Sequence, residues 1–128
     1  MPTLDARIDN VVAGDDVQIT RTITSVPSSE TLTDGWFTVK EHPDDLDADA
    51  IISKQITPSN VAGTGHITDT GADGTGAVRF DLADTDTAKL TPGRDYYWDV
   101  QVKTSGGAIY TPTAGKIRTV QGVTTDIS

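Results

Sequence analysis

The chain has 128 residues, enough for one domain with a sizeable buried core. Its net charge is -9 and its ten Lys and Arg residues are scattered, which argues against binding to nucleic acid or to an anionic membrane. The lack of cysteine excludes disulfide bonds, thiolate zinc sites and a cysteine nucleophile. Neither a signal-peptide pattern nor an apolar run of transmembrane length is visible, so we expect a protein made in a reducing cytoplasm.

Alternation of apolar and polar residues with a period of two recurs along the chain and predicts short strands. In the first clear strand, 16–24, Val17, Ile19 and Ile23 share one face. Arg21 lies on this apolar face, which we expect near a sheet edge with the stem buried and the charged head in water. Further strands are predicted at 35–40, 51–56, 67–70, 77–82, 95–104, 108–111 and 116–120, with an acidic loop or short helical turn at 41–50 and a glycine-rich connector at 71–76.

The strand at 95–104 has the strongest alternation, and Gly106 and Gly107 provide a hairpin turn after it. Its residues Tyr96, Trp98, Val100 and Val102 are predicted to point inward, and Tyr97, Asp99, Gln101 and Lys103 outward. Seven to eight short strands predict an all-β sandwich, a single domain over residues 1–128. We expect Trp36, Phe80, Trp98 and Val100 in its core, and we expect an N-terminal arm at about 1–12 and a C-terminal tail at about 121–128 to reach adjacent subunits.

The segment between the strands at 77–82 and 95–104 carries a turn with a known structural role. Leu90 is followed by Pro92, Gly93 and then Tyr96, which resembles the tyrosine corner of fibronectin type III and related immunoglobulin-like domains. In such a corner the leucine fills the end of the core, Pro-Gly forms the turn, and the tyrosine hydroxyl bonds back to turn backbone. The resemblance implies an immunoglobulin-like sandwich of antiparallel strands and a structural role for Tyr96.

A longer resemblance covers roughly residues 15–126. It consists of WFTVK at 36–40, DADAIISK at 47–54, FDLADTDTAKL at 80–90, YYWDVQ at 96–101, and the closing segments 115–117 and 123–126. Together they resemble the immunoglobulin-like domains of tailed-phage virion proteins, for example the N-terminal domains of upper baseplate proteins. No fibre or receptor-binding segment follows, so we expect a stand-alone accessory part of the particle rather than a receptor-binding protein.

Metal binding is an alternative that the acidic residues leave open. Asp45, Asp47 and Asp49 alternate as in a calcium loop, but Ala50 and Ile56 stand where that loop needs glycine and glutamate. Asp69, together with carbonyls and the Asp73 carboxylate of the segment 71–76, is a second candidate. We favour a solvated acidic loop and expect neither metal nor cofactor.

Catalysis has little support in the sequence. His42 and His66 are predicted in loops, and neither lies in a recognisable nucleophile motif. Asp84 and Asp86 form a carboxylate pair, but glycosidase chemistry needs a cleft, and a domain of this size offers little depth for one. We therefore expect that the protein is not an enzyme.

Sugar binding is the third alternative, because exposed aromatic rings stack on glycans. Tyr97 and Tyr110 are predicted on outward faces, whereas Trp36, Phe80 and Trp98 are assigned to packing.

The resemblance implies a virion structural protein of a tailed bacteriophage, and among such proteins we favour a capsid decoration or cement protein that stabilises the particle. It would be assembled in the bacterial cytoplasm, as a homo-oligomer in contact with the major capsid protein or other virion proteins. A tail or baseplate accessory protein is the alternative location. A carbohydrate-binding module for host attachment is the alternative of another class.

Overall fold

The computed structural model describes residues 3–24, 26–27, 29–42, 44–45, 49–72 and 74–121. This part of the chain is mostly β-strand, and it contains no helix long and apolar enough to cross a membrane. The elements are β1 (Thr3–Val12), β2 (Val17–Ile23), β3 (Leu32–Lys40), β4 (Ile52–Ile56), β5 (Gly65–Asp69), β6 (Gly76–Leu82), α1 (Asp84–Thr87), β7 (Asp95–Thr104) and β8 (Ile109–Val120).

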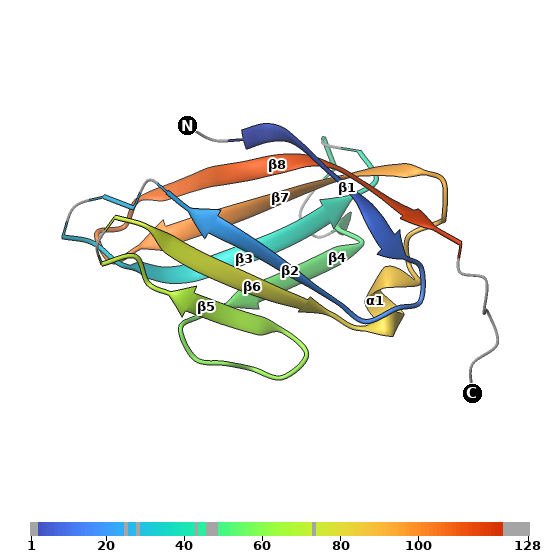
Figure 1. Cartoon of the computed structure of the whole chain (residues 1–128). Helices are drawn as coiled ribbons and strands as arrows, with labels where there is room; N and C mark the ends of the chain where they lie inside the picture. The colour runs from blue at the N-terminus through green and yellow to red at the C-terminus, as the bar shows by residue number, and fades with distance from the viewer. Residues whose placement is uncertain are drawn as a thin grey trace.

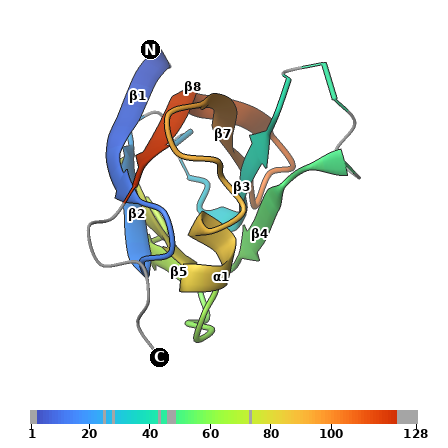
Figure 2. The ribbon, with the colours of Figure 1, turned by 90° about the vertical axis from the view of Figure 1, so that its right-hand side faces the viewer.

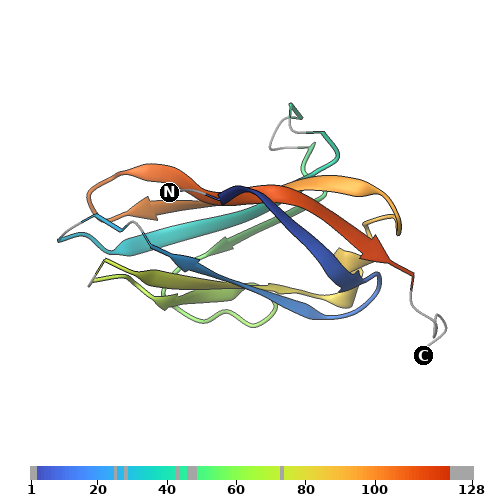
Figure 3. The same cartoon turned by 45° about the horizontal axis from the view of Figure 1, so that its top comes forward.

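The strands form two sheets, a larger one in the order β1-β8-β7-β3-β4 and a smaller one in the order β2-β6-β5 (Figure 1). All pairs of neighbouring strands are antiparallel except β1 and β8, which run parallel. The single turn of α1 lies at one end of the two layers (Figure 2), and the view of Figure 3 shows the larger sheet above the smaller one. The fold is therefore all-β and two-layered.

The core lies between the sheets and follows from the alternation of the strands. Phe37 of β3, Phe80 of β6 and Trp98 of β7 are buried, with the Phe37 ring centroid 5.4 Å from that of Phe80 and 5.9 Å from that of Trp98. Val100 of β7 is fully buried beside them. Burying one such side chain stabilises a fold by about 1.5–3 kcal/mol. Because the cluster contains residues of both sheets, its burial stabilises the packing of one sheet on the other.

Arg21 lies on the inner side of β2, an edge strand of the smaller sheet. Its guanidinium stands 5.1 Å from the ring centroid of Trp98 and donates to the carbonyl of Thr20 at 2.6 Å. Burial lowers the pKa of Arg21. Arg21 thus lies at a sheet edge, as expected, but its charged head is partly buried over the aromatic core rather than in water.

Trp36 differs from the sequence-based expectation, because it is not in the core. Phe37 and Val39 are fully buried, so alternation along β3 turns Trp36 to the opposite face, where it is half-buried. Gly35 takes the inward position before it, and a Cβ there would lie 3.1 Å from the Ile56 side chain. Two adjacent aromatic residues in one strand cannot both face inward, and the structure selects Phe37.

The N-terminal segment also differs from the expected arm. Residues 3–12 form β1, an edge strand of the larger sheet, and Ile8 and Val11 are buried in the core. Two register shifts interrupt its pairing with β8. The expected C-terminal tail lies outside the described residues except for Gln121.

The two strands predicted at 108–111 and 116–120 are one continuous strand, β8. A register shift in its pairing with β7, between Val100 and Val102, lies opposite the stretch that contains Pro112. A bulge of this kind lets a strand continue through a residue that lacks a backbone donor.

Candidate functional site

The turn before β7 has the bonds of a tyrosine corner. The Tyr96 hydroxyl accepts a hydrogen bond from the Thr91 amide at 2.9 Å, and Leu90 is fully buried. The Gly93 amide, at a φ of 82°, donates to the Thr119 carbonyl at 2.9 Å, and the Thr119 hydroxyl donates to the Leu90 carbonyl at 3.2 Å. The bonds of Leu90 and Gly93 therefore fasten the turn to β8, and the Tyr96 hydroxyl is used inside the fold by its bond from Thr91.

Among the predicted metal ligands that the structure describes, Asp45 and Asp69 take part in hydrogen bonds within turns. Asp45 accepts a hydrogen bond from the His42 amide at 3.1 Å, and Asp69 accepts one from the Gly71 amide at 2.9 Å. Both carboxylates thus serve their own turns. Asp47 and Asp73 lie outside the described residues, and among those that are described no group of three or more His, Cys, Asp or Glu side chains is placed to hold a metal ion.

The residues considered for catalysis are dispersed. His66 lies in β5 opposite Arg79 rather than in a loop, because the strand begins two residues before the predicted one. His42 is exposed in the loop after β3. Asp84 is exposed, whereas Asp86 is buried and ion-paired with Lys54. The two carboxylates therefore do not face a common site.

Asp86 connects α1 to β4. One of its carboxylate oxygens lies 2.8 Å from the Lys54 ammonium and accepts a hydrogen bond from the Ala83 amide at 2.9 Å. Burial alone would raise the pKa of Asp86, but the bonds from Lys54 and Ala83 and the charges of Lys54 and Lys89 outweigh it and hold the pKa below its ordinary value. Asp86 is therefore a charged structural residue.

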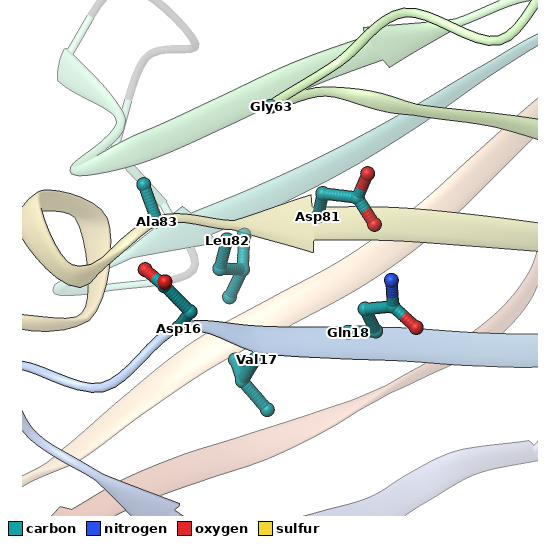
Figure 4. A pocket seen from close by; sticks show the side chains of 7 residues that line it. All are labelled: Asp16, Val17, Gln18, Gly63, Asp81, Leu82 and Ala83. Atoms are coloured by element: carbon teal, nitrogen blue, oxygen red, sulfur yellow. The ribbon is translucent and has the colours of Figure 1, made fainter.

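A shallow, open depression of about 340 Å³ lies where β2 meets β6 (Figure 4). Asp81 is paired with Arg79 at 3.1 Å, and Asp16 accepts a hydrogen bond from the Asp84 amide at 2.7 Å. Both carboxylates of the depression thus have structural partners, and its geometry favours no reaction. Its lining residues are Asp16, Val17, Gln18, Gly63, Asp81, Leu82 and Ala83.

The outer face of the larger sheet, the side turned away from the core, gathers half of the ten cationic residues. Near one end of this face, Asp95 of β7 accepts hydrogen bonds from Arg118 at 2.8 Å and from Arg7 at 3.2 Å. The Arg118 bond contributes most to holding the pKa of Asp95 below its ordinary value. The cations of the outer face are Arg7, Lys40, Lys103, Lys116 and Arg118, and its acidic side chains are Asp34, Asp95 and Asp99, counted over the described side chains.

Aromatic residues lie on the same outer face. The Lys116 ammonium stands 5.8 Å from the ring centroid of Tyr97, which pairs across the sheet with Lys116 on one side and Lys40 on the other. Trp36 pairs with two exposed residues, Gln55 of β4 and Gln101 of β7. The sequence-based prediction did not place Trp36 on this outer face between two glutamines. The alternation of buried and less buried residues along β3 would have indicated it.

Tyr110 is less suited to a binding platform. It is half-buried in β8 and packs against the core cluster. Burial raises its pKa, and the nearby charge of Glu30 adds to the effect. Of the aromatic residues predicted to face outward, only Tyr97 belongs to the outer face with Trp36.

The chain matches no protein-family model and no curated protein.

Proposed function

We propose that the chain is an immunoglobulin-like domain that serves as a structural protein of a tailed-phage particle, as a capsid decoration or cement protein. The observation that carries the proposal is β1, a ten-residue edge strand. In the part of the chain that the structure describes, it has a neighbouring strand on one side only. The backbone groups of such an edge are suited to pairing with a strand of another subunit.

The immunoglobulin-like assignment rests on two features. The bonds of Tyr96 and the burial of Leu90 have the pattern of a tyrosine corner. Two packed sheets with strands of five to twelve residues agree with a sandwich of seven to eight strands, in which the pairing of β1 with β8 is a parallel exception.

The mechanism follows from how the polar residues are used. Asp69, Asp86 and Tyr96 are engaged in bonds that hold the fold together, so the chain would act through contact area rather than chemistry. Many copies on one particle would turn weak contacts, formed by β1 with the major capsid protein or another virion protein, into firm attachment. The net charge of -9 would keep unassembled copies apart in solution.

The test is to purify the phage particles through a density gradient and to count copies of the chain by quantitative mass spectrometry. Many copies per particle are expected for a capsid decoration protein, and few copies would favour the alternative of a tail or baseplate accessory protein. Absence from the particles would overturn the proposal.

Attachment through β1 has a separate test, hydrogen exchange of the free and the particle-bound chain. The amides of β1 should gain protection on the particle, while those of β5, an edge strand of the smaller sheet, serve as the internal control. Protection at β5 without any at β1 would contradict attachment through β1, and the chain would still be a particle protein.

A further inference from the structure

Trp36 has surroundings that suit a sugar ring. It lies in β3, which has neighbouring strands on both sides, and its cross-strand partners Gln55 and Gln101 are exposed on the same face. Cross-strand partners lie about 5 Å apart, so the two amides flank the indole closely. A hexose presents an apolar C–H face, which packs on an aromatic ring, and hydroxyl groups at its rim, which the donors and acceptors of glutamine amides can bind.

A second, cationic subsite lies along the same strands. Tyr97 is four residues before Gln101 on β7, which places it about 14 Å away at about 3.4 Å per residue. It is flanked in the register by Lys40 and Lys116, and Arg7, which is ion-paired with Asp95, lies next to Lys116 on β1. In a chain with a net charge of -9, this cationic end is complementary to an acidic ligand.

The surroundings of Trp36 fit a glycan better than a protein surface. The core of a protein interface is a contiguous apolar patch with a polar rim. Among the described residues, the large exposed hydrophobic side chains are Val61, Ile109 and Val120. Ile109 and Val120 lie at opposite ends of β8, and Val61 lies before β5, so the three do not form a contiguous patch. Trp36 instead has the exposed Gln55 and Gln101 as its cross-strand neighbours.

We propose that the outer face of the larger sheet binds an acidic oligosaccharide that lies along β7. A sugar ring would stack on Trp36 between Gln55 and Gln101, and a carboxylate-bearing sugar would lie at the cationic end beside Lys116 and Lys40. The site does not depend on the proposed virion role. A particle protein attached through its edge strand β1 would leave this face free to contact polysaccharide on a cell surface.

The test uses the isolated chain and a panel of uronic-acid oligosaccharides, namely hexamers of mannuronate, guluronate, galacturonate and glucuronate. Each hexamer is paired with its neutral counterpart without carboxylates. Binding is followed by tryptophan fluorescence and by calorimetry. Trp98 is 2% exposed, so a ligand-induced change in emission reports mainly on Trp36. At least one acidic hexamer should bind more tightly than its neutral counterpart, and the difference should shrink as salt rises from about 0.1 M to about 1 M, because the Debye length falls from about 10 Å to about 3 Å.

Variants locate the site. Trp36→Ala should weaken binding at least about tenfold, which corresponds to about 1.4 kcal/mol. Val61→Ala, which removes an exposed side chain outside the outer face, should leave binding unchanged. The double variant Gln55→Ala/Gln101→Ala provides a second test if the tryptophan variant fails to fold. Lys40→Gln/Lys116→Gln should remove the preference for the acidic hexamer and retain weak binding to its neutral counterpart.

Three outcomes would overturn the proposal, and none of them bears on the virion role. The first is no binding to any member of the panel, and the second is binding that is unchanged by substitution of Trp36 and of both glutamines. The third is binding of polyglutamate as tight as that of the best hexamer, which would identify an acidic protein surface as the ligand.

Discussion

The ion pair between Lys54 and Asp86 gives the sharpest test of how the helical turn is held to the sheets. The variants to compare are Asp86→Asn, Lys54→Met and the double variant. Asparagine retains an oxygen that can accept the Ala83 amide hydrogen, so the single change at Asp86 removes mainly the charge. The Lys54 ammonium would keep its hydrogen bond to the Gly63 carbonyl at 3.2 Å, but it would lose its anionic partner.

The magnitude follows from burial. The Lys54 and Asp86 side chains are 18% and 12% exposed, between the fully buried and the solvent-exposed cases. Breaking a buried pair costs about 3–5 kcal/mol, whereas an exposed pair contributes about 0–1 kcal/mol. Each single substitution should therefore lower the free energy of unfolding by about 2 kcal/mol. The first substitution already breaks the ion pair, so the second removes no further interaction. The free energy of unfolding of the double variant should therefore also fall by about 2 kcal/mol rather than by about 4 kcal/mol.

Urea unfolding followed by tryptophan fluorescence measures all four proteins in one double-mutant cycle. The matched control is the cycle for Arg7 and Asp95, a solvent-exposed pair on the outer face that should show a smaller coupling. Additive losses at Lys54 and Asp86 would contradict this expectation, because they would mean that the 2.8 Å contact contributes nothing specific to stability.

Three further predictions concern stability. Tyr96→Phe removes the acceptor for the Thr91 amide and should cost about 1 kcal/mol in urea unfolding; an unchanged midpoint would show that the corner is not stabilising. Gly65→Ala places a Cβ 2.0 Å from the Arg79 carbonyl oxygen at a φ of 114°, so it should cost about 3 kcal/mol and lower Tm by about 10 °C; Gly63→Ala, with nothing within 4 Å of its Cβ, is the control and should cost less. Since the pKa of Asp86 is lowered on folding, its stabilisation is present above the unfolded pKa of about 3.9 and is lost as the pH falls through the lower folded value; the free energy of unfolding should therefore fall more steeply below about pH 4 in the parent chain than in Asp86→Asn, and parallel acid titrations would contradict this.

Strands with strict alternation could be predicted from the sequence, because period two directly encodes one buried face. The predicted strand at 95–104 matches β7, and its four expected inward residues are all buried. The same rule, applied to Phe37 and Val39, would have turned Trp36 outward. The preference of large aromatic residues for cores led to the wrong assignment, although alternation is the stronger constraint within a strand.

Features that depend on long-range pairing were not accessible from the sequence. The segment of β1 shows weak alternation, and its place in the sheet comes from pairing with β8, more than 100 residues later, and from burial of Ile8 and Val11. The ion pair of Asp86 likewise depends on Lys54, which is distant in sequence. The cationic end of the outer face arises because Arg7, Lys116 and Lys40 come from three separate strands.

Cryo-electron microscopy of the intact particle is the sharpest test of the proposal that this chain is a structural protein of a tailed-phage particle. We expect density for the two-layered domain repeated across the capsid shell, with the edge strand β1 facing a neighbouring subunit. Density confined to the tail would favour the alternative of a tail or baseplate accessory protein. Particles without any density for the domain would contradict the virion role.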